Sequence, residues 1–281
     1  MRNKLRGVNL RGKRVLISGA SGGIGRQLVA AFLSEGAHVI AVDVSEENLS
    51  KLKAFHRGAD LVTERLDISD APSCEGIFSD GKEIDVLINN AAASMGLIRD
   101  DHLDRLVSID EVTPQMWDHF ISSNLSGAWY LTRIAVPNMK KNGWGRIINV
   151  TTSFFTMLRP MFHPYGPSKA ALEAMSAGHA GEFAPYGITV NVVVPGGPTD
   201  TPMVPAVTKM DRNALISPSV MVPPMLWLCS KEADHVTGMR YVAANWNPNS
   251  TIAEARAASE APIAWPDLAV SPVWPGGRPK A

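Results

Sequence analysis

A tyrosine and a lysine four residues apart, Tyr165 and Lys169, are the first candidates for chemistry in this sequence. If a helix begins near Tyr165, both side chains lie on one face of it. A free tyrosine has a pKa of roughly 10, and a nearby ammonium group can lower that pKa by roughly 1–3 pH units because it stabilises the phenolate. The pair could therefore transfer a proton. The Ser153 hydroxyl, 12 residues upstream, could hold a carbonyl or alcohol oxygen beside Tyr165.

A glycine-rich segment near the N-terminus, Gly19 to Gly25, reads GASGGIG. A short apolar strand is expected before it, at 13–18, and a helix after it that ends at Gly36. Glycines let the backbone approach a pyrophosphate closely, and the start of a helix offers free N–H groups. Taken alone, the segment also fits a tight strand-to-helix connection that binds nothing.

Asp43 closes the second apolar strand. A carboxylate at this position accepts hydrogen bonds from ribose hydroxyls and repels a 2′-phosphate. Gly22 and Val44 offer no base for that phosphate, and Arg26 lies one residue into the helix. We therefore expect NAD rather than NADP, with Arg26 turned toward the phosphate as the alternative. Asp43 could also cap the helix that follows it.

Apolar strand segments alternate with helix-forming segments along the chain. Strands are expected at 13–18, 37–43, 60–66, 84–92, 144–152, 188–197 and 237–243, and helices after Gly25, at 45–56, from Thr113 to about 143, at 165–184 and at 220–231. This alternation predicts an α/β fold with a doubly wound parallel sheet and helices on both faces. Residues 94–112 are expected to form a long loop.

Candidate residues gather where the expected strands end. They are Gly19–Gly25, Asp43, Asp67, Asn89–Ala92, Thr151–Ser153 and Pro195–Thr201. Because parallel strands present their carboxyl ends at one edge of the sheet, we expect these residues to form one ligand site there.

Several of these motifs occur in an order that resembles the short-chain dehydrogenase/reductase (SDR) family of the classical type, over about residues 10–243. The motifs are Gly19–Gly25, Asn89-Asn90-Ala91-Ala92, Asn124, Ser153, Tyr165-x-x-x-Lys169 and Pro195-Gly196-Gly197. The resemblance implies a single-domain Rossmann-like fold with about seven strands. It also implies hydride transfer between a nicotinamide cofactor and an alcohol or ketone carbon. We expect a dinucleotide-binding catalytic domain at 1–243 and a tail at 244–281, packed on the domain or on a neighbouring subunit.

The resemblance assigns a role to each catalytic candidate. Tyr165 is the general acid/base, Lys169 binds the nicotinamide ribose and lowers the pKa of Tyr165, and Asn124 holds a water linked to Lys169. The family's commonest spacing places the substrate-orienting hydroxyl at Thr152, but we expect Ser153, because a small bulge could restore its place and serine is the family's residue. Cofactor contacts are implied for Gly19, Ser21, Gly22, Gly23, Ile24, Gly25, Asp43, Asp67, Ile68, Asn90, Ala91, Ala92, Tyr165, Lys169, Pro195, Gly196, Gly197 and Thr201.

Composition narrows the class of protein further. Lys plus Arg and Asp plus Glu number 27 each, so neither nucleic acid nor an anionic membrane is an expected partner. The two cysteines, Cys74 and Cys229, lack metal-ligand spacing, and we expect no metal site. With no signal peptide or apolar span in view, the chain is expected to be cytoplasmic.

Large apolar side chains near Ser153 indicate an apolar or aromatic alcohol or ketone as substrate. They are Phe154, Phe155, Met157, Leu158, Met161 and Phe162, any one of which could instead be core. Three tryptophans in the tail, Trp246, Trp265 and Trp274, need burial, and the resemblance implies a homotetramer or dimer. The alternative function is a non-catalytic nucleotide sensor or scaffold with the same fold.

Overall fold

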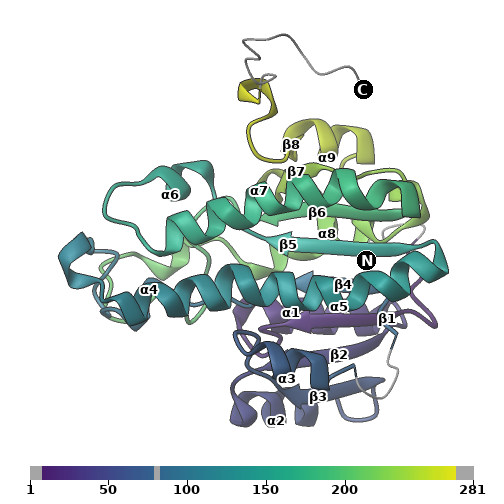
Figure 1. Cartoon of the computed structure of the whole chain (residues 1–281), viewed down its shortest axis with the longest axis horizontal. Helices are drawn as coiled ribbons and strands as arrows, with labels where there is room; N and C mark the ends of the chain where they lie inside the picture. The colour runs from purple at the N-terminus through teal and green to yellow at the C-terminus, as the bar shows by residue number, and fades with distance from the viewer. Residues whose placement is uncertain (1–7, 79–82, 270–281) are drawn as a thin grey trace, which may run out of the picture.

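The computed structural model describes residues 8–78 and 83–269. Its centre is an eight-stranded sheet in the order β3-β2-β1-β4-β5-β6-β7-β8 (Figure 1). The strands are β1 (Arg14–Ser18), β2 (His38–Asp43), β3 (Leu61–Arg65), β4 (Val86–Asn89), β5 (Gly145–Val150), β6 (Ile188–Val194), β7 (Met239–Val242) and β8 (Glu260–Pro262). The first seven pair in parallel, and β8 joins β7 antiparallel. The predicted doubly wound parallel sheet is confirmed, with one additional strand.

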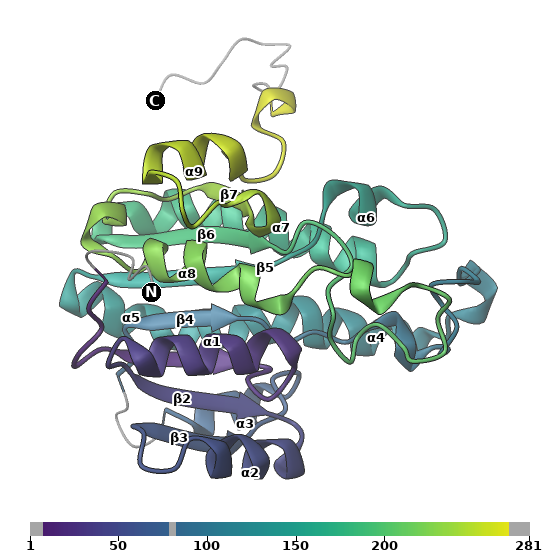
Figure 2. The same cartoon turned by 180° about the vertical axis from the view of Figure 1, so that it is seen from behind.

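Helices cover both faces of the sheet. They are α1 (Gly23–Ser34), α2 (Glu46–Phe55), α3 (Ala71–Gly76), α4 (Pro114–Ile121), α5 (Gly127–Asn142), α6 (Phe154–Leu158), α7 (Tyr165–Phe183), α8 (Val222–Leu228) and α9 (Ile252–Ser259). α5 and α7 lie across one face (Figure 1) and α1 and α8 across the other (Figure 2). Two apolar cores result, one on each side of the sheet.

The alternation of side chains along β1 shows why the sheet needs both layers. Val15 and Ile17 enter the core beneath α1, whereas Leu16 enters the core beneath α5 and α7. All three side chains are fully buried. Burying one such side chain stabilises the fold by about 1.5–3 kcal/mol. A strand that is apolar on both faces is stable only between two layers of helices.

The helix expected from Thr113 to about 143 is present and changes type partway along. α4 and α5 are joined by a π-helical turn, Ser122–Ser126. One extra residue in such a turn rotates the helix that follows it, and π turns are frequent at functional sites. Asn124 lies inside this turn and is fully buried.

The described part of the C-terminal segment, residues 244–269, contains α9 and β8. β8 pairs with β7, and Trp246 packs on Trp227 with ring centroids 5.4 Å apart. The Tyr241 hydroxyl donates a hydrogen bond of 3.0 Å to Glu260. The segment therefore extends the sheet at its edge. Trp274, for which burial was expected, lies outside the described residues.

No helix in residues 8–78 or 83–269 is both long and apolar enough to cross a bilayer.

Candidate active site

The glycine-rich turn joins β1 to α1 and is fastened to the end of β4. The Asn90 side-chain amide donates hydrogen bonds of 3.0 Å to the carbonyl oxygens of both Ser18 and Gly19. Gly19 has a φ of 62°, and a Cβ there would lie 2.8 Å from the Ala91 Cα. Only glycine combines this backbone conformation with so close an approach. The two predicted cofactor segments, 19–25 and 90–92, therefore meet.

The start of α1 is open toward this turn. Gly22 is the N-cap residue, and no side chain caps the free N–H groups of the first turn. A Cβ on Gly25 would lie 2.2 Å from the Gly19 carbonyl oxygen, so the helix packs directly on the turn. Uncapped N–H groups at a helix start favour a bound anion. This cradle of glycines fits the pyrophosphate of a dinucleotide.

The loop after β6 lies on the same cradle. A Cβ on Gly23 would come within 2.5 Å of the Thr201 side chain, so the absence of a side chain at Gly23 makes room for Thr201. Gly196, in the same loop, has a φ of 110°, a conformation that favours glycine. The structure thus brings the predicted segment from Pro195 to Thr201 against the glycine-rich turn.

Asp43 lies at the carboxyl end of β2, beside the turn. Its two carboxylate oxygens accept hydrogen bonds of 3.1 Å from the backbone N–H groups of Ser21 and Ser45. Each oxygen has further acceptor capacity, so the ribose hydroxyls could still bind there. Asp43 does not cap α2, because the Ser45 hydroxyl accepts the capping bond from Asn48.

Asp67 and Ile68 follow β3 at the same sheet edge. Asp67 accepts hydrogen bonds from the backbone N–H and the hydroxyl of Ser69, at 2.9 and 2.7 Å. Ile68 is buried and packs against Gly127, where a Cβ would lie 2.7 Å from it. Both residues are thus held in fixed positions at the sheet edge that also carries Asp43.

Tyr165 and Lys169 begin α7 and point toward the end of β5. The Lys169 ammonium group is fully buried and donates a hydrogen bond of 2.8 Å to the Val150 carbonyl oxygen. Burial lowers the pKa of Lys169 to about 8. The two side chains thus share one face of the helix, as their spacing predicts.

The pKa of Tyr165 moves opposite to the expectation. Burial raises the pKa of Tyr165 to about 12, and a hydrogen bond with the Thr152 side chain opposes this rise only partly. The expected lowering by Lys169 is wrong in this structure, because removing the phenol from water outweighs any stabilisation of the phenolate. At neutral pH Tyr165 is therefore a protonated hydroxyl, suited to donate a proton.

Two adjacent hydroxyls, on Thr152 and Ser153, have different partners. The Thr152 side chain interacts with the Tyr165 hydroxyl and acts to lower the pKa of Tyr165. The Ser153 Oγ instead caps α6, accepting a hydrogen bond of 3.1 Å from the Thr156 N–H and lying 2.9 Å from the Thr156 hydroxyl. The structure therefore places Thr152, rather than Ser153, against Tyr165.

Asn124 uses both ends of its side chain within the protein. Its Oδ1 accepts a hydrogen bond of 2.6 Å from the Ala93 N–H, and its Nδ2 donates to the Ala93 carbonyl at 3.3 Å and to the Ser168 hydroxyl at 3.0 Å. The π-helical turn is thereby joined both to the loop after β4 and to α7, one residue from Lys169. That Asn124 also holds a water stays a prediction.

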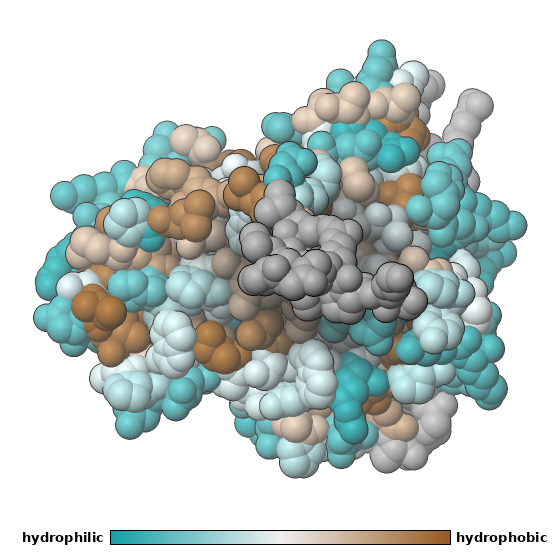
Figure 3. All heavy atoms as spheres, turned by 45° about the horizontal axis from the view of Figure 1, so that its top comes forward, coloured by the Kyte–Doolittle hydropathy of each residue, from teal (hydrophilic) through white to brown (hydrophobic). Residues whose placement is uncertain are grey.

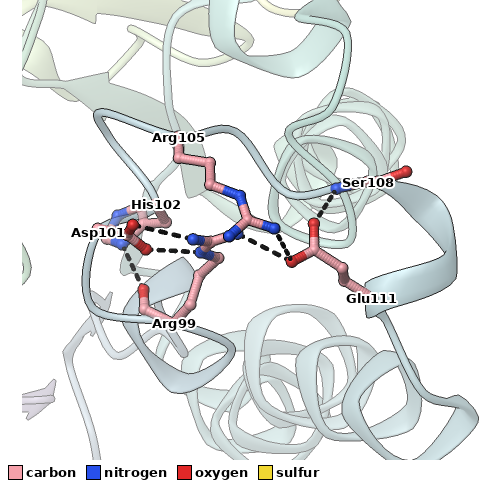
Figure 4. Close-up of polar contacts among 6 residues, drawn as sticks. All are labelled: Arg99, Asp101, His102, Arg105, Ser108 and Glu111. Atoms are coloured by element: carbon pink, nitrogen blue, oxygen red, sulfur yellow. Dashed lines mark hydrogen bonds and ion pairs between the residues drawn. The ribbon is translucent and has the colours of Figure 1, made fainter.

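The loop at 94–112 carries a cluster of ion pairs (Figure 4). Arg99 pairs through two hydrogen bonds with Asp101, at 2.6 and 2.9 Å, and through a third with Glu111 at 2.8 Å. Met95 and Val107 from this loop share a small apolar core with Tyr165. The loop is therefore ordered, because Arg99 near its start is paired with Glu111 near its end.

Residues 198–216 lie against the same loop. Asp104 joins the two segments, since its carboxylate accepts hydrogen bonds from the Thr208 hydroxyl at 3.4 Å and the Lys209 N–H at 3.0 Å. Asp104 was not predicted from the sequence, because an acidic residue in a loop gives no indication of the distant residues that it will contact. An apolar hollow of about 300 Å³ lies nearby, lined by Ile109, Val112, Thr113, Pro114, Trp117, His163 and Pro167. Neither Tyr165 nor Thr152 lines it.

The apolar residues after Ser153 do not form one surface. Met157 and Phe162 are buried, whereas Phe155 and Leu158 are 74% and 72% exposed. Brown, apolar side chains gather in Figure 3 on the left of the molecule, the side that carries α6 in Figure 1. The burial of Met157 and Phe162 is thus explained by packing inside the protein, without an apolar substrate.

Among the residues that the structure describes, no group of three or more His, Cys, Asp or Glu side chains could hold a metal ion. Cys74 and Cys229 are buried and unbonded, and burial raises the pKa of both thiols.

Comparison with known proteins agrees with this geometry. The family described as short chain dehydrogenase matches residues 13–212. D-xylose 1-dehydrogenase of Caulobacter vibrioides is 32% identical over 250 residues, covering 85% of this chain and 97% of that protein.

Two solved structures show the similarity of fold, each with a TM-score of 0.70 and 25% identity. One is 3-ketoacyl-(acyl-carrier-protein) reductase from Brucella melitensis complexed with NADH, covering 82% of this chain and 95% of that one. The other, from Beutenbergia cavernae, is assigned as an NAD(P)-dependent gluconate 5-dehydrogenase and holds NADP at low occupancy. It covers 83% of this chain and 95% of its own.

Proposed function

Because the chain belongs to the short-chain dehydrogenase/reductase family, we propose that it interconverts a secondary alcohol and a ketone with NAD, with Tyr165 as the acid/base. The class of reaction follows from the family: the protein is an NAD(P)-dependent oxidoreductase acting on CH–OH. The preference for NAD, the role of each residue and the substrate are our proposal. The observation that carries it is the placement of Tyr165 and buried Lys169 at the start of α7, with Lys169 hydrogen-bonded to Val150 at the end of β5, two residues before Thr152.

The cofactor site is assigned to five segments at one sheet edge. The glycine-rich turn and the α1 start hold the pyrophosphate, and Asp43 accepts the ribose hydroxyls. Asp67 and Ile68 flank the adenine, and Asn90 to Ala92 with Pro195, Gly196, Gly197 and Thr201 line the nicotinamide half. When bound, the cofactor supplies or accepts the hydride. The remaining chemistry, a proton and its orientation, belongs to the protein.

Proton transfer is assigned to Tyr165. In the reductive direction its hydroxyl donates a proton to the oxygen of the carbonyl as that oxygen becomes an alkoxide. The Thr152 hydroxyl donates a hydrogen bond to the same oxygen and holds it next to Tyr165. The charged Lys169 stabilises the phenolate left behind. In the oxidative direction each transfer runs in reverse, and Tyr165 must first lose its proton.

The cofactor preference gives the first prediction. Asp43→Asn removes the charge but keeps one acceptor, and we expect NADH binding to weaken about 10–100-fold, since hydrogen bonds to charged groups contribute roughly 1.5–3 kcal/mol. NADPH binding should stay equal or improve, because repulsion of the 2′-phosphate is lost. Fluorescence titration with both cofactors measures the two affinities.

Arg26→Ala is the companion variant, because Arg26 is the nearest exposed cation to the turn. It should leave both affinities unchanged. A selective loss of NADPH binding in Arg26→Ala, with NADPH bound more tightly than NADH by the wild type, would replace the NAD proposal by NADP.

The pH dependence of ketone reduction gives the second prediction. Lys169, with its pKa lowered to about 8, loses its charge as the pH rises through that value, whereas Tyr165 keeps its proton until about 12. We therefore expect kcat/KM for reduction to be flat from about pH 6 to about pH 7.5 and to fall through about pH 8. Lys169→Arg should move this fall to higher pH. A rate that rises steadily across this range would exclude charged Lys169 from the reaction.

The substrate remains the least constrained part of the proposal. Phe155 and Leu158, exposed on α6, and Met203 and Val207, exposed on the 198–216 segment, favour an apolar or aromatic ketone. Acetophenone and 1-phenylethanol should outperform D-xylose and 3-hydroxybutyrate in a panel with NADH or NAD⁺. The converse order would remove the apolar assignment and leave the chemistry in place.

The second candidate function is a non-catalytic nucleotide sensor. It requires NADH binding without turnover of any ketone in the panel, unaffected by Tyr165→Phe.

A further inference from the structure

Two opposite charges are buried directly behind the segment that carries Thr152. Glu173 of α7 is 0% exposed and Arg240 of β7 is 5% exposed. The Arg240 Nε donates a hydrogen bond of 2.9 Å to the Glu173 Oε1. Glu173 follows Lys169 by four residues, so Tyr165, Lys169 and Glu173 lie on one face of α7. Sequence reasoning did not single out either member of this pair.

The pair binds the two residues that immediately precede Ser153. The Thr151 hydroxyl donates a hydrogen bond of 2.6 Å to the Glu173 Oε2. The Arg240 Nη2 donates one of 2.8 Å to the Thr152 carbonyl oxygen. Together with the bond from Lys169 to Val150, three successive residues are held by charged side chains. Charge-assisted bonds of this kind are roughly twice as strong as neutral ones.

The C-terminal segment closes the pair on its other side. The Ala264 N–H donates a hydrogen bond of 3.3 Å to the Glu173 Oε1. The Arg240 guanidinium lies 4.1 Å from the centre of the Phe154 ring, and that ring contacts Trp265 at 5.6 Å between centroids. The segment after β8 therefore covers the charges and the first residue of α6 together.

Stability alone does not explain a charged pair at this position. Burying two charges costs desolvation that their attraction often fails to exceed, and a well-packed apolar pair is frequently as stable. The charged pair instead fixes the position of this segment, because Glu173 accepts a hydrogen bond from the Thr151 hydroxyl and Arg240 donates one to the Thr152 carbonyl oxygen. Backbone fixed in this way holds the Thr152 hydroxyl in one place relative to Tyr165.

We propose that Glu173 and Arg240 form a positioning device for the Thr152 hydroxyl, sealed by residues 263–265 of the C-terminal segment. The pair touches no reacting atom; it acts through the backbone of 151–152. The proposal rests on the proposed function for the reaction that Thr152 serves. The fixing of the segment itself can be measured without that reaction.

The chain supplies a matched control in Arg146. This arginine is 1% exposed, pairs with Asp234, and lies near the start of β5, whereas Thr151 follows the end of that strand. Arg146→Met and Arg240→Met each remove one buried guanidinium. The first leaves Asp234, which is 51% exposed and still accepts a hydrogen bond from Trp144, and the second leaves Glu173, which is fully buried. Only Arg240→Met removes a hydrogen bond to the backbone of Thr152.

The experiment compares these variants with Arg240→Lys and Thr151→Val in three measurements. They are kcat and KM for the best ketone of the panel, NADH affinity, and hydrogen–deuterium exchange of residues 152–158 followed by mass spectrometry. For Arg240→Met we expect kcat to fall about 10–100-fold, as a displaced catalytic group implies, with NADH affinity within about 2-fold. Exchange at 152–158 should accelerate. Arg240→Lys, which keeps one charged donor, should recover part of kcat.

Arg146→Met should lower the melting temperature by less than Arg240→Met, because Asp234 is half-exposed, and should leave kcat within about 2-fold and exchange at 152–158 unchanged. Equal effects of Arg146→Met and Arg240→Met on kcat, or unchanged exchange in Arg240→Met, would overturn the proposal. If Arg240→Met does not fold, Thr151→Val, which removes a single hydroxyl, decides by the same readouts. If the wild type reduces no ketone, the proposed function fails, and the exchange measurement alone decides whether the pair fixes the segment.

Discussion

Tyr165→Phe is expected to lower kcat by at least about 10³-fold in both directions and to leave NADH affinity within about 3-fold. The variant loses only the hydroxyl that donates or accepts the proton. Its ring keeps the edge-to-face contact with Phe162, whose centroid lies 6.0 Å away. Because the pKa of Tyr165 is raised to about 12, wild-type Tyr165 is protonated at neutral pH and no ionic contact is lost there. Stopped-flow oxidation of NADH with the best ketone of the panel measures the effect.

Tyr241→Phe is the matched control for this variant. Tyr241 is fully buried and makes one side-chain hydrogen bond, to Glu260 at 3.0 Å, and it lies between β7 and the C-terminal segment. Loss of one such bond is expected to reduce the free energy of unfolding by about 1 kcal/mol and to leave kcat unchanged. If Tyr165→Phe keeps a tenth or more of wild-type kcat, another group transfers the proton.

Thr152→Val is expected to lower kcat by about 10²-fold, because the variant keeps the branched shape and loses the hydroxyl that orients the substrate oxygen. Thr152→Ser should retain most of the activity. Ser153→Ala removes the cap of α6 and should cost about 1 kcal/mol of stability with kcat within about 5-fold. Steady-state kinetics and thermal unfolding on the three variants separate the two hydroxyls.

The opposite result has a defined meaning. If Ser153→Ala abolishes turnover and Thr152→Val does not, the serine expected from the family resemblance carries the reaction. The α6 cap would then have to open when substrate binds, since the Ser153 Oγ is engaged by Thr156.

Local pattern was enough to predict the elements that carry the proposed cofactor site. The glycine-rich turn, Asp43 and Asn90 each follow a short apolar strand, and the carboxyl ends of parallel strands necessarily meet at one edge. The strand order places β1 beside β4, which brings Gly19 and Ala91 together. Nothing beyond strand sequence and connectivity was needed for this part.

The elements that were missed are short or depend on distant partners. α3 and α6 span 6 and 5 residues, too few to display a helical period. β8 has only 3 residues and exists through its pairing with β7. The π-helical turn is specified by contacts of Asn124 with Ala93 and Ser168, which lie 31 and 44 residues away.

The electrostatics of the site could not be read from spacing. Tyr165 and Lys169 are placed as predicted, but the pKa of each moves against its charged form because both groups leave water. Glu173 and Arg240 are 67 residues apart, and only the fold makes them partners. One indication of this pair was present in the sequence, the charged Arg240 inside the otherwise apolar segment Met239–Val242.

Hydride transfer is tested most directly by following the hydrogen itself. NADH carrying deuterium at both positions of nicotinamide C4 is mixed with the wild type and the ketone panel, and the alcohol products are analysed by mass spectrometry. The account predicts an alcohol with one deuterium on the carbinol carbon, formed by the wild type and not by Tyr165→Phe. NADH binding with no deuterated product from any ketone would contradict it and leave the nucleotide sensor as the function of this chain.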